Sequence, residues 1–178
     1  MRAVADALQV FFDDRAEAEV RVRWERLTAA GVPSLATRTH RRHRPHLSLA
    51  LGLAIPQKAR ADLRRDLALL ALPDLWLYTL GTFPDGQHTL FLGAVTDTEL
   101  LAVHSAVHDV LAGRVRGPAG QYLPGAWVPH CTLAQDLTVE QVAAGFAALL
   151  PLRPIRAAVS GVGITDTRTG EIDFLLTR

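Results

Sequence analysis

Residues Pro45–Ala50 read PHLSLA, and residues Pro129–Ala134 read PHCTLA. Both segments have the form Pro-His-x-Ser/Thr-Leu-Ala, and they lie almost half the chain length apart. Each follows a loop-like stretch and opens a run of residues with a strand pattern. An internal repeat at this spacing predicts two lobes of similar build, related by a pseudo-two-fold axis.

The repeat also determines which side chains share a face of each strand. Side chains alternate along a strand, so His46 and Ser48 point to one face while Leu47 points to the other. The same reasoning places His130 beside Thr132 on one face. If the two strands meet across a cleft, the site holds two imidazoles and two hydroxyl groups.

This set of side chains suits phosphodiester chemistry. Histidine titrates near neutral pH, so one of His46 and His130 can accept a proton while the other donates one. The hydroxyls of Ser48 and Thr132 can hydrogen-bond the non-bridging phosphate oxygens. For a 2′,3′-cyclic phosphate, one histidine would activate water and the other would protonate the departing ribose oxygen. This scheme requires no metal, and the near symmetry of the motifs leaves the acid and base roles unassigned.

The rest of the chain alternates between strand-like and helix-like patterns. Strand patterns occur at Ala7–Phe12, His46–Leu53, Leu75–Leu80, Thr89–Ala94, Trp127–Ala134, Ile155–Ile164 and Glu171–Leu176. Helical spacing of apolar residues occurs at Arg15–Ala30, Gln57–Leu70, Thr96–Leu111 and Thr138–Leu150. Several strand pairs look like hairpins, so the pattern predicts an α+β fold with antiparallel pairing and not a doubly wound parallel sheet. No linker separates independent domains, so residues 1–178 are expected to form a single bilobal domain.

Composition limits which binding partners and which cellular location can be expected. The net charge is +1, which argues against a general nucleic-acid coat protein and favours contact with a few phosphates. Cys131 is the single cysteine, so neither an intramolecular disulfide nor a multi-cysteine zinc site is possible. Charged residues, prolines or glycines interrupt each apolar run before it could cross a bilayer, and no signal-peptide pattern is present. A cytoplasmic location without membrane association is expected, and no obligate protein partner is evident.

The paired motifs resemble those of the 2H phosphoesterase superfamily, in particular its 2′-5′ RNA ligase-like branch. The resemblance implies a bilobal α+β fold with helices outside and the catalytic strands side by side in a central groove. It also implies action on 2′,3′-cyclic phosphates or 2′-5′ linkages without metal or cofactor. Carried over residue by residue, it makes His46 and His130 catalytic, and Ser48 and Thr132 phosphate-binding. The specific match is confined to the two hexapeptides.

A basic stretch precedes the first motif. Arg42 and Arg44 lie in a segment without acidic residues, and guanidinium groups suit the recognition of phosphate. We expect these two arginines to steer an anionic end toward His46. A solvated basic loop is the alternative interpretation of the same residues.

Two aromatic residues and a pair of histidines allow more than one interpretation. Tyr122 and Trp127 flank the second motif and could stack on an unpaired base, although aromatic residues more often anchor a core or a loop. His104 and His108 have the spacing of two metal ligands on a helix, but no third ligand accompanies them. A surface helix face is the expectation for these two histidines.

Three classes of function fit the sequence to different degrees. The first is a metal-independent phosphoesterase for RNA ends or small cyclic nucleotide-like phosphates, and 2′-5′ ligation is related chemistry in the same site. The second is a module that binds a nucleotide or an RNA end without turnover, which would not need two titratable side chains. The third is a histidine-based metal site, for which two histidines are too few ligands.

Overall fold

The computed structural model describes residues 5–37, 43–84 and 86–178. The helices are α1 (Asp14–Ala29), η1 (Leu35–Thr37), α2 (Gln57–Leu67), α3 (Thr98–Leu111), η2 (Gly120–Tyr122) and α4 (Val139–Leu149). The strands are β1 (Asp6–Phe12), β2 (His46–Ala54), β3 (Leu75–Thr82), β4 (Leu90–Ala94), β5 (Arg116–Pro118), β6 (His130–Ala134), β7 (Ile155–Ala157), β8 (Val159–Asp166) and β9 (Ile172–Thr177).

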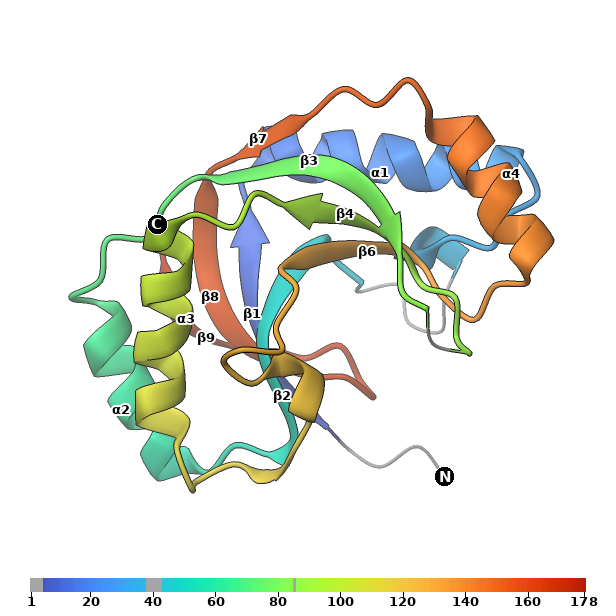
Figure 1. Ribbon diagram of the computed structural model, residues 1–178. Helices are drawn as coiled ribbons and strands as arrows, with labels where there is room; N and C mark the ends of the chain where they lie inside the picture. Colours follow the sequence, from blue (N-terminus) through green and yellow to red (C-terminus); the bar gives the residue numbers. More distant parts are fainter. Residues whose placement is uncertain (1–4, 38–42, 85) are drawn as a thin grey trace.

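The strands form two sheets, and each pairing among the described strands is antiparallel. The first sheet has the order β5-β2-β1-β8-β9, and the second has the order β6-β4-β3-β7. Figure 1 shows α2 and α3 packed together beside the first sheet, and α1 and α4 beside the second. The arrangement confirms the predicted α+β fold of two antiparallel lobes with helices outside.

The same order of elements surrounds both motifs. The first motif lies in the series β1, α1, β2 and α2, and the second lies in the series β4, α3, β6 and α4, where the short strand β5 is inserted between α3 and β6. In both series the motif strand pairs with the strand before it, β2 with β1 and β6 with β4. The helix between them packs against the opposite lobe, because α1 contacts β7 and α3 contacts β2. These matched connections are the pseudo-symmetry that the repeated hexapeptide predicts.

Burial follows the same pattern along the two motif strands. His46 and Ser48 are half-buried on one face of β2, whereas Leu47 and Leu49 are fully buried in the core. The strand that starts at His130 repeats this alternation residue by residue. The predicted division between a polar face and a core face is therefore confirmed. It also means that the core contacts of each strand fix the side to which its histidine points.

The structure corrects the single strand predicted at Ile155–Ile164. The chain leaves the second sheet after β7 and joins the first sheet at β8, with Ala158 between them. The backbone N–H of Asp13 donates to the Ala158 carbonyl at 2.9 Å, and its carboxylate accepts from the Ala158 N–H at 3.1 Å. This contact, between residues far apart in the sequence, holds the chain where it changes sheets.

Other element boundaries differ by a few residues from those predicted. The strand expected from Trp127 begins at His130, and the helix expected to reach Leu70 ends at Leu67. α4 starts at a capping box, in which the Thr138 hydroxyl accepts from the Gln141 N–H and the Gln141 side chain accepts from the Thr138 N–H. Within the described residues, no helix is long and apolar enough to cross a membrane.

Candidate active site

The two motif strands contact each other although they belong to different sheets (Figure 1). β2 is an inner strand of the first sheet, and β6 is an edge strand of the second. The Cys131 thiol hydrogen-bonds the His46 backbone, so the beginnings of the two strands are in contact. His130 is also close enough for its positive charge to repel one on His46. The structure thus brings the two predicted histidines into one site.

Each imidazole is oriented by the same kind of bond to the backbone. Nδ1 of His46 lies 2.7 Å from the carbonyl oxygen of Arg44, and Nδ1 of His130 lies 2.6 Å from the carbonyl oxygen of Val128. A carbonyl oxygen only accepts a hydrogen bond, so Nδ1 carries the proton in both rings. Nε2 is then the basic nitrogen of each neutral ring, and it becomes a donor when the ring is protonated.

Burial makes a positive charge unfavourable on both histidines. It lowers the pKa of His46 to about 4, opposed by the hydrogen bond to Arg44 and reinforced by repulsion from His130. Burial also lowers the pKa of His130, while the hydrogen bond to Val128 acts in the opposite direction. Both rings are therefore neutral at neutral pH when no anion is bound.

Aromatic side chains surround the two histidines. The ring centroid of Phe11 lies 6.4 Å from that of His46. Phe83 and Phe91 lie 4.9 Å and 5.2 Å from His130, and these two rings stack on each other at 4.4 Å. Because these apolar rings replace water around the imidazoles, they are a physical source of the lowered pKa values.

The hydroxyl groups of the site include one that sequence reasoning missed. Ser48 and Thr132 are half-buried on the same strand faces as the histidines. The Ser48 side chain hydrogen-bonds the phenol of Tyr122, whose ring lies 6.5 Å from that of His130. Burial raises the pKa of Tyr122 and the Ser48 bond lowers it by less, so the phenol keeps its proton. Tyr122 therefore offers a hydrogen-bond donor as well as an aromatic ring.

Trp127 holds the loop before β6 against β2. Its indole N–H donates to the Ser48 carbonyl at 3.0 Å. One face of the indole stacks on the His104 ring, with centroids 3.9 Å apart and an interplanar angle of 6°. One face of the indole is therefore used for packing, and base stacking by the other face stays a prediction.

His104 and His108 do not form the surface helix face that was expected. His104 is 2% exposed, and its Nε2 donates to the Tyr122 carbonyl at 2.9 Å. Nε2 of His108 donates to the Leu49 carbonyl at 3.0 Å. Burial, and then the charge of His108, lowers the pKa of His104 to about 4. The pair ties α3 to β2 and to the Tyr122 loop, and no group of three or more potential metal-ligating side chains occurs among the described residues.

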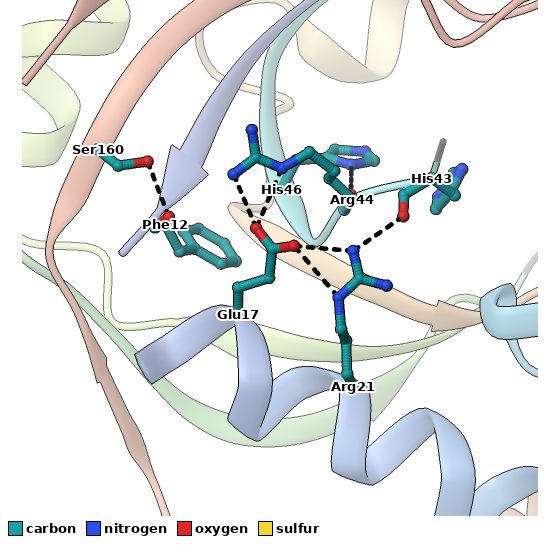
Figure 2. Close-up of polar contacts among 7 residues, drawn as sticks. All are labelled: Phe12, Glu17, Arg21, His43, Arg44, His46 and Ser160. Atoms are coloured by element: carbon teal, nitrogen blue, oxygen red, sulfur yellow. Dashed lines mark hydrogen bonds and ion pairs between the residues drawn. The ribbon is translucent and has the colours of Figure 1, made fainter. Parts of the chain in front are cut away.

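Arg44 lies beside the site and is already paired. Its Nε and Nη2 donate to Glu17 Oε2 at 3.1 Å and 2.8 Å (Figure 2). The central carbon of its guanidinium lies 5.2 Å from the centroid of the Phe11 ring. With Arg21, Arg44 lines an open pocket of about 660 Å³, whose other side is formed by residues 170–174 of the β8–β9 turn and β9. Arg42, the other arginine predicted to bind phosphate, lies outside the described residues.

Comparison with known proteins agrees with this fold. The family model for the 2′-5′ RNA ligase superfamily matches residues 12–171. A structure of Usb1 from Kluyveromyces marxianus aligns with a TM-score of 0.53 at 8% identity, over 96% of this chain and 97% of that chain. A second structure, Kluyveromyces marxianus Usb1 with uridine monophosphate, aligns with a TM-score of 0.56 at 9% identity, over 98% of each chain. No protein with a curated description matches the sequence.

Proposed function

Because the chain belongs to the 2′-5′ RNA ligase superfamily, we propose that it is a phosphoesterase that acts on RNA-type phosphate esters. The proposed substrate is a 2′,3′-cyclic phosphate, at an RNA end or on a small nucleotide. The observation that carries the proposal is the matched orientation of His46 and His130. Each has Nδ1–H fixed on a backbone carbonyl and Nε2 left for proton exchange.

The proposed reaction moves two protons and breaks one P–O bond. A neutral histidine accepts a proton from water at Nε2 while the water oxygen attacks phosphorus. The bond from phosphorus to O3′ breaks, and the other histidine, which is protonated, donates its Nε2 proton to O3′. The products are a 2′-phosphate and a free 3′-hydroxyl. Transfer of one proton between the histidines through solvent restores the starting state, and no step in this scheme uses a metal.

The substrate itself promotes the required protonation state. A phosphodiester is an anion, and negative charge near a histidine raises its pKa, which offsets the lowering by burial. The hydroxyls of Ser48, Thr132 and Tyr122 are proposed to donate to the non-bridging oxygens, where negative charge develops in the transition state. Arg44 is proposed to add a positive field, weakened by its pairing with Glu17.

A nucleotide-sized substrate is supported by the fold. The Usb1 structure with uridine monophosphate has the same fold as this chain. We propose that the Tyr122 ring, which lies beside His130, stacks on the base of the terminal nucleotide.

Ligation of 2′-5′ ends is the second candidate, and the family match favours it as related chemistry. In that reaction a 5′-hydroxyl attacks the cyclic phosphate in place of water, and the same two histidines exchange the same protons. Hydrolysis and ligation therefore compete for the same bound cyclic phosphate. Which of them prevails depends on whether water or a second RNA end occupies the position of attack.

The first test is turnover of 2′,3′-cyclic nucleotides, and of an RNA oligomer with a cyclic phosphate end, in excess EDTA. We expect EDTA-resistant release of a 2′-phosphate, with product isomers resolved by chromatography. An oligomer with a 5′-hydroxyl added as acceptor would reveal ligation as a longer product. Binding of these substrates with neither hydrolysis nor ligation would leave only the binding module, and activity abolished by EDTA would reject the two-histidine mechanism.

Ser48→Ala and Thr132→Val are expected to lower kcat/KM by about 10- to 100-fold each, because a hydrogen bond to a charged group contributes roughly 1.5–3 kcal/mol. The measurement is steady-state kinetics on a cyclic nucleotide. Ser160→Ala is the matched control, since the Ser160 hydroxyl donates to the Phe12 carbonyl and takes no part in the proposed site. Tyr122→Phe separates the contribution of Ser48 from that of the phenol it contacts. Unchanged kinetics in Ser48→Ala and Thr132→Val would remove the hydroxyls from the mechanism.

A further inference from the structure

The segment before β2 determines how His46 is oriented, yet it has no regular secondary structure. His43, Arg44 and Pro45 belong to neither a helix nor a strand. The Arg44 carbonyl is nevertheless the acceptor for His46 Nδ1–H. The direction of that carbonyl must therefore be fixed by contacts outside the sheet.

Glu17 supplies such contacts from the first turn of α1. Its Oε2 accepts the two hydrogen bonds from the Arg44 guanidinium, and its Oε1 accepts two from Arg21, at 3.2 Å from Nε and 2.7 Å from Nη2. Arg21 Nη2 also donates to the His43 carbonyl at 3.3 Å. Figure 2 shows Glu17 between the two guanidinium groups, with dashed lines from its carboxylate to both arginines and from Arg21 to the His43 carbonyl. We name Glu17, Arg21 and Arg44 the Glu17 clamp.

The clamp is both shielded and charged. The Glu17 side chain is 15% exposed, against 43% for Arg21 and 32% for Arg44. Burial raises the pKa of Glu17, but the hydrogen bonds and charges of Arg44 and Arg21 lower it by more, so the net shift is downward. The carboxylate therefore stays ionised at neutral pH and holds both arginines. Charge-assisted, two-point contacts of this kind restrict geometry more than a single neutral hydrogen bond does.

The second histidine has the same ring orientation but a different support. Its acceptor, the Val128 carbonyl, lies between two anchored neighbours. The Trp127 indole N–H donates to the Ser48 carbonyl at 3.0 Å, and the Pro129 carbonyl accepts from the Ala94 N–H at 2.9 Å. Both contacts are neutral. The two halves of the site thus differ in what holds the acceptor, which makes His130 an internal control for any effect of the clamp on His46.

We propose that Glu17 is a positioning residue for His46: through Arg44 and Arg21 it fixes the peptide whose carbonyl binds Nδ1–H, and so it keeps Nε2 as the nitrogen that exchanges the proton. The effect on turnover rests on the proposed function, whereas the effect on the ring does not. Loss of the Glu17 charge would free the Arg44 peptide to rotate. The His46 ring would then lose the bond that selects its tautomer.

The test compares wild-type protein with Glu17→Gln by long-range ¹H–¹⁵N NMR. The protein is labelled with ¹⁵N at histidine and contains no substrate. The His46 signals are those that are absent from the spectrum of His46→Gln. In the wild type we expect both His46 and His130 to carry the proton on Nδ1. In Glu17→Gln we expect His46 to become a mixture of tautomers while His130 is unchanged. We also expect kcat to fall about 10- to 100-fold, since a misplacement of about 1 Å costs up to roughly 10²-fold, with a smaller change in KM.

Two further variants make the result decisive. Glu19→Gln removes a carboxylate from the same helix, where it pairs with Arg15 and Arg23. Among the described residues it has no bond to His43, Arg44 or Pro45, so both rings should keep the wild-type tautomer. Arg21→Gln removes half of the clamp at a half-exposed position, and it provides the test of the proposal if Glu17→Gln does not fold. His46 held on Nδ1–H in the folded clamp variants would overturn the proposal. The wild-type protein could also fail to turn over the cyclic phosphate while the His46 tautomer still shifts in Glu17→Gln. That result would support the positioning role and reject the proposed function.

Discussion

Replacement of His46 or of His130 by alanine is expected to lower kcat/KM for a 2′,3′-cyclic phosphate by about 10²–10⁴-fold, because a general acid–base step contributes about that much. Each ring is held in its own position by a bond from Nδ1 to a different backbone carbonyl, so neither is placed to make the proton transfer of the other. The measurement is steady-state kinetics of the two single variants and the double variant. Because both proton transfers occur in one transition state, kcat/KM of the double variant should be only slightly below that of the less active single variant.

A substrate with a good leaving group distinguishes the two roles. An ester of 4-nitrophenol needs little protonation as its phosphorus–oxygen bond breaks, so the variant that lacks the acid should recover most of its rate on such a substrate. The variant that lacks the base should not recover. Thermal unfolding of each variant shows whether a lost rate reflects lost structure. If either folded single variant keeps near wild-type turnover on the cyclic phosphate, the two-histidine mechanism is wrong.

The sequence predicts those parts of the fold that depend on local pattern. Alternation along Pro45–Ala50 correctly assigns Leu47 and Leu49 to the core and His46 to the opposite face, because a strand has a fixed period of two. The repeated hexapeptide also predicts the two matched lobes. The change of sheets at Ala158 was missed, because it depends on a contact with Asp13, and a run of strand-forming residues does not reveal where it changes partners.

The candidate site was predictable to the same extent. His46 and His130 carry their own signal, since each stands in a motif that the chain repeats. Glu17 carries none, because a glutamate in the first turn of an amphipathic helix is common and its role depends on Arg44 approaching from another segment. The sequence predicts a surface position for His104, because the spacing of histidines on a helix does not reveal a buried carbonyl that could bind the ring. The structure supplies that acceptor at Tyr122. Tertiary contacts, which local pattern does not encode, account for each of these omissions.

The pH dependence of kcat/KM is expected to reach its maximum below pH 6.5. This ratio reports the ionisations of the free enzyme, and the reaction needs one neutral and one protonated histidine. Burial lowers the pKa of His46 to about 4 and lowers that of His130 below its usual value, so the productive form is most abundant in mild acid. Above the upper pKa, kcat/KM should fall about tenfold per pH unit, and the two apparent values belong to the coupled pair. Bound phosphate raises both pKa values, so the maximum of kcat should lie at higher pH than that of kcat/KM.

The acid side of this profile requires a measurement of folding at each pH. His46 and His104 have pKa values of about 4 in the folded protein, against about 6.5 for histidine in an unfolded chain. Between these values the unfolded state binds more protons, so stability rises with pH and falls on acidification. Urea unfolding across the same pH range separates this loss from the titration of the site. A kcat/KM that is flat from pH 6 to 8.5 in folded enzyme would contradict the need for one neutral and one protonated histidine. At least one of the two pKa values would then not control the reaction.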